Sequence, residues 1–480
     1  MVHAPSAKGF IRVSIGRALS TGIIAAGLVF STAPLSAAPG DEESGSSRAA
    51  TVRTATGAYL AGRVAQGRED VSGAARFTDK ALASMPDEPE LQARAFLLHL
   101  AAGNIERSLQ LAPGILESSP NNLVGRIVLA SRDALLGDLD GALTNLATTE
   151  RESAGQYIIP LLTGWALAGS GDIEAAVAAV EPMLEVPGMK GAALLHLGLI
   201  RDYAGDLNGA RDSLEAALSN GQTYRVTQAL GRLYERVGEP ENALTLYDGF
   251  NRGGGERPLL AADAERVRAG EPAPDGPLFS TPTQGMAETL ADLASLWRRE
   301  ASTDSALIYA QLARYLHPEL ARATVLVADT LAIRGRTDEA LAVYREVPRS
   351  NPFSWSARLN ESRMIDDGGD MEGAIALLHA MADEVPESTG PLIRIGDIQR
   401  SHRHFEEAVE AYDQAQDRQS AAVSNDWSFL YKRGIALERS KQWDRAENDL
   451  RAAIALRPDH AHLLNYLGYS YIDRGEMVEE

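Results

Sequence analysis

Small residues recur along the chain at a nearly constant interval, and each follows a polar turn of the Gly-Asp type by four or five positions. The interval is 34 residues, apart from 33 before Ala243 and 38 before Ala446, and one longer break before Ala306. Such a period predicts a stack of helix pairs, with the small residue placed where the two helices of a pair cross closely. These register positions are Ala74, Ser108, Ala142, Ala176, Ala210, Ala243, Ala306, Ala340, Ala374, Ala408 and Ala446.

Three further residue types keep the same register. Glycines at the turns supply the left-handed backbone that ends a first helix, and prolines stop the second helix of a pair. An acidic residue follows most of the turns, where it faces the positive end of the second helix. The glycines are Gly103, Gly137, Gly171, Gly205 and Gly238; the prolines are Pro86, Pro120, Pro318, Pro352, Pro386 and Pro458; the acids are Glu106, Asp140, Glu174, Glu241, Asp304, Asp338, Glu372, Glu406 and Asp444.

Several units resemble the signature of the tetratricopeptide repeat family. The residues that carry this resemblance are Leu230-Gly231-x2-Tyr234, Ala243-x3-Tyr247, Ala340-x3-Tyr344, Gly396 with Ala408-x3-Tyr412, Gly434 with Ala446, Ala453 and Pro458, and Leu467-Gly468-x2-Tyr471. The pattern recurs about eleven times over residues 55–460, although the tryptophan of the family signature is missing from its place in every unit. The resemblance implies an all-α fold, an α-solenoid of helix-turn-helix repeats that forms a right-handed superhelix.

The period breaks between residues 252 and 283, which contain three consecutive glycines and five prolines around one short predicted helix, Leu259–Ala269. We therefore expect an N-terminal repeat block at 55–251, an irregular linker at 252–283 and a C-terminal block at 284–480. The last block contains about five and a half repeats, because the first helix around Leu463–Ile472 has no partner helix after it. We expect either that the sequence is a fragment or that another chain covers this helix.

The N-terminal segment has the layout of a secretory signal peptide. Three basic residues precede an apolar run, Ala18–Phe30, and small residues follow at Ser36–Ala38. We expect a signal peptide at 1–37, cleaved after Ala37, and a disordered tether at 38–54. An uncleaved membrane anchor stays open as the alternative, and either way the protein is predicted to be exported to the periplasm or cell envelope.

Composition and charge exclude several classes of function. The net charge of −20 and the absence of a long basic run disfavour a nucleic-acid partner. The chain has no cysteine, hence no disulfide, thiolate nucleophile or N-terminal lipid anchor site. We predict no cofactor and no enzyme activity, since the sequence contains no phosphate loop, hydrolase elbow or kinase signature.

Two histidine pairs and one acidic cluster resemble metal ligands only superficially. His402/His404 and His460/His462 are two residues apart, so on a helix they point in opposite directions, and no third ligand accompanies them. The acids at Asp366–Glu372 lack the spacing of a calcium loop and fall in a turn that every repeat contains. We predict no metal site.

Binding to a protein or peptide is the expected function, because in this family the first helix of each pair lines the concave side of the superhelix. The outward positions of these helices are apolar in repeats two to five and polar with mixed charge from repeat six onward, which predicts a two-part groove. The alternative for the apolar part is that these side chains pack as core. The candidates are Leu97, Ile127, Leu161, Trp165, Leu195, Leu199, Gln228, Arg232, Arg298, Arg363, Arg400, Tyr431, Asn465 and Tyr469.

Three functions fit these features to different degrees. The first is an adaptor or scaffold at the bacterial cell envelope that binds protein or peptide partners. The second is the substrate-holding or regulatory arm of an envelope enzyme whose catalytic domain lies beyond residue 480. Glycan handling is a third, but it would need more exposed aromatic residues than repeats two to five provide.

Overall fold

A computed structural model describes residues 54–149, 154–253, 259–418 and 425–475 of the protein. All regular elements in these ranges are helices, which confirms the predicted all-α solenoid of helix pairs. The signal peptide predicted at 1–37 and the tether predicted at 38–54 lie outside the described residues, apart from Thr54. None of the described helices has the length and apolar character needed to cross a membrane.

The chain forms two compact units, and each unit is built from two separate stretches of the sequence. The first unit comprises residues up to 243 together with 271–336, and the second comprises 244–270 and the residues from 337 onward. This division differs from the predicted blocks at 55–251 and 284–480, because the helices that follow the interruption pack against helices of the N-terminal half.

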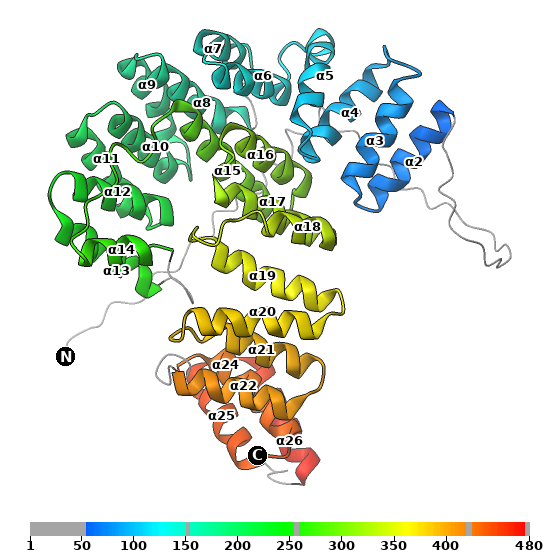
Figure 1. The fold of residues 1–480 in the computed structure, drawn as a ribbon, viewed down its shortest axis with the longest axis vertical. Coiled ribbons are helices and arrows are strands. Elements are labelled where there is room, and N and C mark those ends of the chain that lie inside the picture. The colour runs from blue at the N-terminus through cyan, green and yellow to red at the C-terminus, as the bar shows by residue number, and fades with distance from the viewer. Residues whose placement is uncertain (1–53, 150–153, 254–258, 419–424, 476–480) are drawn as a thin grey trace, which may run out of the picture. The chain divides into compact units, whose positions relative to one another are not determined.

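In the first unit, eleven consecutive helices form an arc, and three later helices lie on its inner side (Figure 1). The arc runs through α2 (Ala55–Gly67), α3 (Val71–Leu82), α4 (Pro89–Ala101), α5 (Ile105–Ser118), α6 (Leu123–Leu135), α7 (Leu139–Ala147), α8 (Gly155–Gly169), α9 (Ile173–Val180), α10 (Lys190–Tyr203), α11 (Leu207–Asn220) and α12 (Tyr224–Arg236), with a short 3-10 helix η2 (Glu181–Glu185) after α9. The inner helices, which we call the insert, are α15 (Pro282–Arg299), α16 (Thr303–Leu316) and α17 (Ala321–Ile333).

The second unit is a shorter series of helix pairs, and α13 crosses the boundary between the units at residues 243 and 244. Its helices are the rest of α13 (Pro240–Gly253), α14 (Ala261–Arg268), α18 (Thr337–Tyr344), α19 (Ser354–Asp367), α20 (Met371–Glu384), α21 (Gly390–Ser401), α22 (Phe405–Arg418), α24 (Trp427–Arg439), α25 (Trp443–Leu456) and α26 (Ala461–Arg474). Helix α14 is the short helix expected within the interruption.

The residues of the 34-residue register lie where the sequence predicts them. All eleven small residues are buried, with at most 1% of their surface exposed, since each lies between the two helices of its pair. The predicted acids Glu106, Asp140 and Glu174 lie in the first turns of α5, α7 and α9. In several repeats an aspartate also caps the N-terminus of the second helix. For example, the Asp206 carboxylate accepts a hydrogen bond from the Gly209 N–H at 3.0 Å.

The turn between the helices of a pair is left-handed even where glycine is missing. The φ angle is +78° at Gly103 and +70° at Gly335. In other repeats the turn position is occupied by a residue with a side chain, and in four of these residues φ is positive as well. These four are Glu69, Ala301, Arg403 and Lys441. The repeat geometry therefore imposes this conformation against the preference of the local residue, at about 1–2 kcal/mol for each non-glycine turn.

We predict opposite effects for two substitutions at neighbouring turns. Ala301→Gly removes the left-handed strain and should raise the free energy of unfolding by roughly 0.5–1 kcal/mol, after allowing for the greater freedom of glycine in the unfolded chain. Gly335→Ala, 34 residues further on, introduces the same strain and should lower it by about 1 kcal/mol. Urea unfolding followed by circular dichroism measures both, and changes of the same sign would contradict this account.

Candidate functional site

The inner side of the first unit, the predicted apolar trough, is filled by the insert. Helix α15 packs against α8 and α6, and α16 packs against α4 and α6. Five of the six apolar candidates, Ile127, Leu161, Trp165, Leu195 and Leu199, are consequently only 0–5% exposed. The sequence left open whether these side chains form a trough or a core, and the structure shows a core.

The sixth apolar candidate, Leu97, lies on α4 and is 37% exposed. It therefore belongs to the edge of this inner face. An open apolar trough along repeats two to five is the part of the prediction that the structure corrects.

Two helices of the insert contain continuously buried stretches, unlike a helix at the surface of a repeat array. Residues Gly285–Ala291 of α15 are buried without interruption, and so are Ala306–Ala310 of α16. By contrast, α20 buries only residues on one stripe, at Ala374, Leu378, Met381 and Ala382. A helix that is apolar around its whole circumference is one that packs on all sides, so the insert is the central layer of the first unit.

Trp165 is the centre of the contact between α15 and the arc. Gly285 passes so close that a Cβ atom there would lie 2.0 Å from Cε2 of the Trp165 indole, so only glycine fits. The rings of Phe279 and Tyr203 meet this indole edge to face, with centroids 5.8 and 6.2 Å away. Its Nε1–H donates a hydrogen bond of 2.9 Å to Nδ1 of His196, which is fully buried.

This hydrogen bond determines the tautomer of His196. Because Nδ1 accepts from the indole, the neutral ring carries its proton on Nε2. Nε2 has no hydrogen-bond partner and lies 3.7 Å from Oδ2 of Asp292 on α15, beyond hydrogen-bonding distance. The arc thus presents a buried donor to α15 that α15 does not reach.

Two acidic residues of α15 are embedded in an ionic cluster. Glu288 is completely buried and accepts from Arg225 of α12 through both oxygens, at 2.9 and 2.7 Å. Arg322 of α17 bridges the two acids, at 2.6 Å from Glu288 Oε1 and 2.6 Å from Asp292 Oδ1. The cluster joins the arc, through Arg225, to two helices of the insert.

The charges in this cluster control one another's ionisation. Burial acts to raise the pKa of Glu288, but Arg225 and Arg322 outweigh it and hold this pKa below its usual range. The same balance, with Arg322 as the main partner, lowers the pKa of Asp292. Burial acts to lower the pKa of Arg225, and Glu288 reverses that effect. Both carboxylates are therefore ionised at neutral pH.

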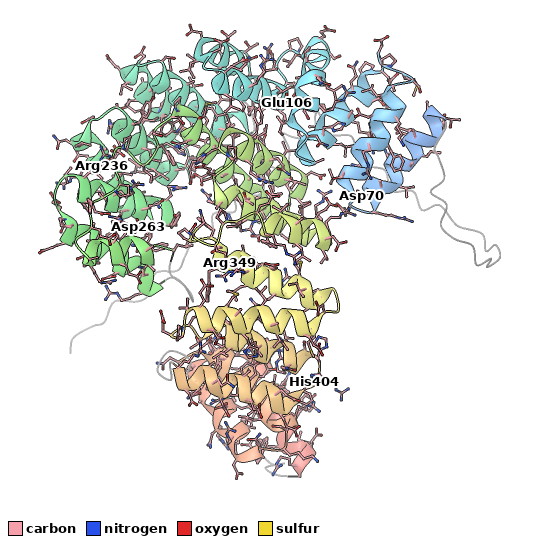
Figure 2. All side chains as sticks on the ribbon, in the orientation of Figure 1. Asp70, Glu106, Arg236, Asp263, Arg349 and His404 are labelled. Carbon is pink, nitrogen blue, oxygen red and sulfur yellow. The ribbon has the colours of Figure 1, made fainter. Side chains whose placement is uncertain are left out.

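Polar contacts extend along the whole insert. On one side, the Leu278 N–H donates to Asp202 at 3.3 Å, and Arg232 contacts the Pro274 carbonyl at 3.5 Å. At the other end, Arg334 pairs with Glu69, and Arg336 pairs with Asp70 at the α2–α3 turn. Asp70 is labelled in Figure 2. The insert therefore crosses the inner face from the end of the arc to its beginning.

Two of the polar candidates lie at this contact, and a third lies on the insert itself. Gln228 accepts from Arg225 at 2.6 Å, and Arg232 contacts the segment that leads into the insert. Arg298 belongs to α15 itself and is half-buried. Gln228 and Arg232 are thus part of the contact between arc and insert.

In the second unit the equivalent positions are not covered by an insert of this kind. Arg363 is exposed and pairs with Asp367 on its own helix at 3.1 Å, while Asn465 and Tyr469 are exposed on α26. Arg400 and Tyr431 are half-buried on α21 and α24. We call this surface of α19, α21, α24 and α26 the first-helix face.

Side-chain contacts join the successive helices of the first-helix face. His402 Nε2 meets Asp366 at 2.8 Å, and Lys432 donates to Asp397 at 2.9 Å. Asp397 also accepts from the Tyr412 hydroxyl at 2.8 Å, and burial together with this carboxylate raises the pKa of Tyr412 above its usual range. The Tyr431 and Tyr466 rings meet edge to face at 5.7 Å. The face is thus a continuous strip of fixed aromatic and charged groups.

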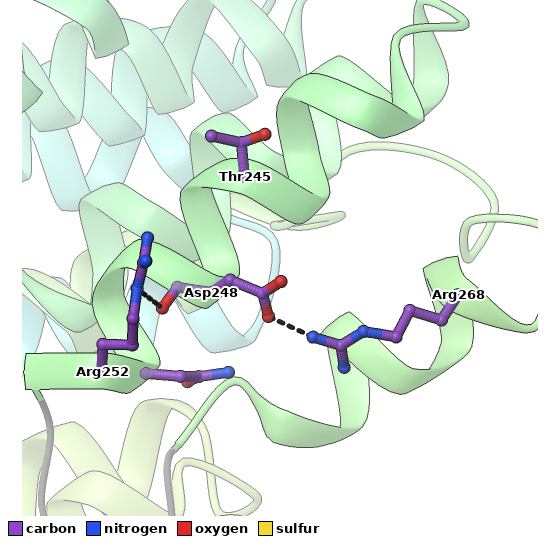
Figure 3. A pocket seen from close by; sticks show the side chains of 5 residues that line it. Thr245, Asp248, Arg252 and Arg268 are labelled. Atoms are coloured by element: carbon purple, nitrogen blue, oxygen red, sulfur yellow. Dashed lines mark hydrogen bonds and ion pairs between the residues drawn. The ribbon is translucent and has the colours of Figure 1, made fainter.

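A separate shallow pocket of about 520 Å³ lies between α13 and α14 (Figure 3). Thr245, Asp248, Asn251, Arg252 and Arg268 line it. Arg268 forms an ion pair with the carboxylate of Asp248, and Arg252 donates to the Asp248 backbone carbonyl at 3.3 Å. Both arginines that line the pocket thus contact Asp248.

The histidine pairs make ordinary contacts in the described ranges. His404 Nδ1 meets the Gln399 amide at 2.9 Å, and His460 stacks on Trp427 with centroids 4.6 Å apart. Among the residues that the structure describes, no group of three or more His, Cys, Asp or Glu side chains is arranged to hold a metal ion.

Sequence analysis missed the residues of the ionic cluster, namely His196, Arg225, Glu288, Asp292 and Arg322, of which His196 and Glu288 are completely buried. A signal for them was present, because Glu288 and Asp292 stand inside an otherwise apolar, alanine-rich helix. A charge in such a helix needs a buried partner. Nothing in the sequence, however, indicates which distant arginine provides it.

Comparison with known proteins matches part of the chain to a repeat family. The sequence model of the tetratricopeptide repeat matches residues 295–354, 334–389, 393–447 and 431–480. The TPR repeat-containing protein PA4667 of Pseudomonas aeruginosa is 29% identical over 139 residues, which make up 29% of this chain and 23% of that protein. The chain thus matches about a quarter of that relative's length.

Solved structures of repeat proteins are similar at low sequence identity. A structure of MamA from Desulfovibrio magneticus RS-1 is 16% identical and covers 36% of this chain and 97% of its own, with a TM-score of 0.31. The yeast Tom70 structure is 11% identical and covers 88% of this chain and 95% of its own, with a TM-score of 0.35. The APC/C Cut9-Hcn1 structure is 14% identical and covers 88% and 91%, with a TM-score of 0.36.

We predict that the ionic cluster makes the first unit acid-sensitive. The pKa of Glu288 is lowered by folding, so its contribution to stability is complete above the ordinary carboxyl value and is lost as the pH falls through the folded value. Glu288→Gln should cost about 3 kcal/mol at neutral pH, because it removes one partner of a buried ion pair. The variant should then lose less further stability than the wild type between about pH 5 and about pH 3.

Urea midpoints across this pH range test the prediction. Glu410→Gln is the control, because Glu410 is exposed on α22. If wild type, Glu288→Gln and the control all lose stability in parallel, the cluster is not the source of the acid sensitivity.

Proposed function

Because the chain belongs to the tetratricopeptide repeat family, whose repeats form protein-interaction scaffolds, we propose that it holds a protein or peptide partner on the first-helix face of its second unit. One observation carries the choice of surface. At equivalent register positions, eleven residues before the small register residue, the first unit buries Trp165 beneath its own insert, while the second unit leaves Arg363 exposed. We propose a non-catalytic role.

The chemistry of this face suits an extended or helical segment with both apolar and charged residues. Tyr469 is 66% exposed, and Leu464 and Ile472 on the same helix are also exposed, which provides apolar area for a partner. Arg363 on α19 and Arg400 on α21 add positive charge elsewhere on this face in a strongly acidic chain. Aromatic and arginine side chains are the residue types that contribute most at protein interfaces.

We further propose that the partner is met at the bacterial cell envelope. The support comes from the N-terminal sequence, in which basic residues, a short apolar run and a small-residue stretch occur in the order of a secretory signal. An exported scaffold would bind proteins of the periplasm or membrane surface. Partners would therefore be sought in envelope extracts and not in cytoplasmic ones.

Two matched pairs of variants test the binding face. Arg363→Glu and Tyr469→Ala should each lower the affinity for the captured partner by roughly tenfold or more, because each removes an exposed contact of the face. The controls are Arg451→Glu and Leu456→Ala, which change exposed residues of the second helix α25. Arg451 resembles Arg363 in exposure, 51% against 46%, and in its ion pair with a residue one turn away, but it lies on the second helix α25.

The measurement is quantitative capture from envelope extracts, with circular dichroism to show that all four variants remain folded. Loss of the same partner in both face variants and its retention in both controls supports the proposal. Equal capture by all four variants would refute binding at this face.

Export is tested separately with the full-length gene product carrying a C-terminal tag. We expect the tagged protein in the periplasmic or envelope fraction, with a mature N-terminus at Ala38 as determined by mass spectrometry. Replacement of Ala37 by a bulky residue such as Leu should retain the precursor, since signal cleavage requires a small residue at that position. Recovery of unprocessed wild-type protein in the cytoplasm would contradict export.

A further inference from the structure

We propose that α26 binds a helix of a partner protein on the side where the other first helices of the second unit carry their second helix, and that this helix presents a large apolar residue to Gly468. The inference rests on the proposed function, because the helix is supplied by the partner held on the first-helix face. It deepens that function by stating which kind of segment the partner provides.

A glycine of the first helix marks the closest approach of the second helix in five repeats. A Cβ atom built on Gly396 would lie 2.5 Å from Cε1 of Tyr412, and one built on Gly434 would lie 2.9 Å from Cγ of Leu450. In every case the neighbour is the residue sixteen positions later, on the second helix of the same pair. The five pairs are Gly62–Thr78, Gly164–Val180, Gly198–Leu214, Gly396–Tyr412 and Gly434–Leu450.

The sizes of the two residues at this contact are complementary. Repeat two reverses the arrangement, with Phe96 on α4 and Ala112 on α5, and both side chains are buried, at 2% and 0% exposure. Two packed helices leave little empty space between them, so a small residue on one is filled by a larger residue on the other. A glycine on the first helix therefore requires a large residue on the second.

Gly468 holds this position on α26, and a Cβ atom built on it would meet nothing within 4 Å. Leu464, one turn earlier, is 48% exposed, whereas the equivalent Leu392 and Leu430, which lie beneath their second helices, are 1% and 4% exposed. Among the residues that the structure describes, none covers this side of α26. We call the surface formed by Leu464 and Gly468 the pairing surface.

The other repeats also define the rest of the helix that fits the pairing surface. The register alanine lies one turn before the large residue, and its carbonyl oxygen is 3.3 Å from the Cβ position on Gly198 and 3.5 Å from that on Gly434. Backbones that approach so closely leave no room for a bulky side chain at the alanine. The partner helix should therefore contain Ala-x3-Leu or Ala-x3-Tyr, a spacing that places both residues on one face.

The position of the pairing surface indicates the source of the helix. Tyr469 of α26 belongs to the first-helix face, and Leu464 lies about 140° away from it around the same helix. The two surfaces share one helix, so a partner bound on the first-helix face is adjacent to the pairing surface. Cover of Leu464 by its helix would remove apolar area from water and add to the affinity.

The test uses the full chain and a labelled peptide of residues 440–458, which contains α25 with Ala446 and Leu450. We expect saturable binding, because α26 has the same residues at 464 and 468 as α24, the natural neighbour of this peptide, has at 430 and 434. Leu450→Ala in the peptide should lower the affinity at least tenfold, since it removes the large residue from the contact. Fluorescence anisotropy measures both affinities.

A reversal of residue size identifies the contact. Gly468→Phe in the protein, combined with Leu450→Ala in the peptide, reproduces the arrangement of Phe96 and Ala112. This variant should prefer the Leu450→Ala peptide, whereas the wild type should prefer the unchanged peptide. Gly468→Phe should fold normally because the space at residue 468 is free, which circular dichroism checks.

The same order of peptide affinities in both proteins would overturn the proposal, and so would the absence of saturable binding to the wild type. Sedimentation that shows a dimer of the wild type but not of Gly468→Phe would assign the pairing surface to a second copy and would also overturn it. A helix of the chain itself that covers α26 in the native protein would exclude the peptide, with the same consequence.

The two proposals fail in different ways. Arg363→Glu changes the first-helix face and should leave peptide binding unchanged. Gly468→Phe should lower the affinity for the captured partner at least tenfold, because it blocks the pairing surface. If Gly468→Phe captures the partner normally, the pairing surface is not used, and binding at the first-helix face stands by itself.

Discussion

The contact between Gly285 and the indole of Trp165 is the constraint on which the first unit depends. It allows α15 to approach the arc closely enough for Glu288 to reach Arg225 and for Phe279 to cover the remaining edge of the ring. A side chain at residue 285 would hold α15 away from the arc and separate these pairs. The insert then could not serve as the central layer that buries the inner side of α4, α6 and α8.

One repeat pattern thus produces two different surfaces. The helix pairs of both units have the same buried small residue and the same left-handed turn, but only the first unit receives an additional layer of helices on its inner face. The apolar side chains there complete a core, and the polar and aromatic residues at the same register in the second unit remain available for contacts. The first-helix face of the second unit is therefore open, whereas the inner face of the first unit is occupied by the chain itself.

The local features of the fold could be predicted from the sequence, because a repeat specifies each unit through residues close to one another in the chain. Ala142 and Ala408 are buried and Gly103 has positive φ for the reasons that the 34-residue period indicates. The left-handed turns at Glu69 and Ala301 could not be read from composition, because the two helices of a pair impose this conformation on residues that disfavour it.

The position of the insert could not be predicted, since periodicity contains no information about which distant helices meet. Helix α15 fits the repeat register and was therefore expected to begin a second block. The sign available in the sequence was the pair of acids, Glu288 and Asp292, within a largely apolar stretch. The structure shows that this stretch packs on all sides, since Gly285–Ala291 are buried without interruption. Because periodicity does not show which distant helices meet, the sequence left open whether Trp165 lines a groove or belongs to a core. Exposed candidates such as Arg363 lie on the surface, as expected.

The most direct test of the central claim is an intramolecular crosslink between the arc and the insert. The native chain has no cysteine, so Asp70→Cys/Arg336→Cys introduces the only two thiols; the native pair at these positions is 3.4 Å apart across 266 residues of sequence. If the insert occupies the inner face, a short bis-maleimide should link the two cysteines within one molecule in high yield, and mass spectrometry should identify the joined peptides. Absence of this crosslink, or links only between molecules, would contradict a first unit closed by its own helices.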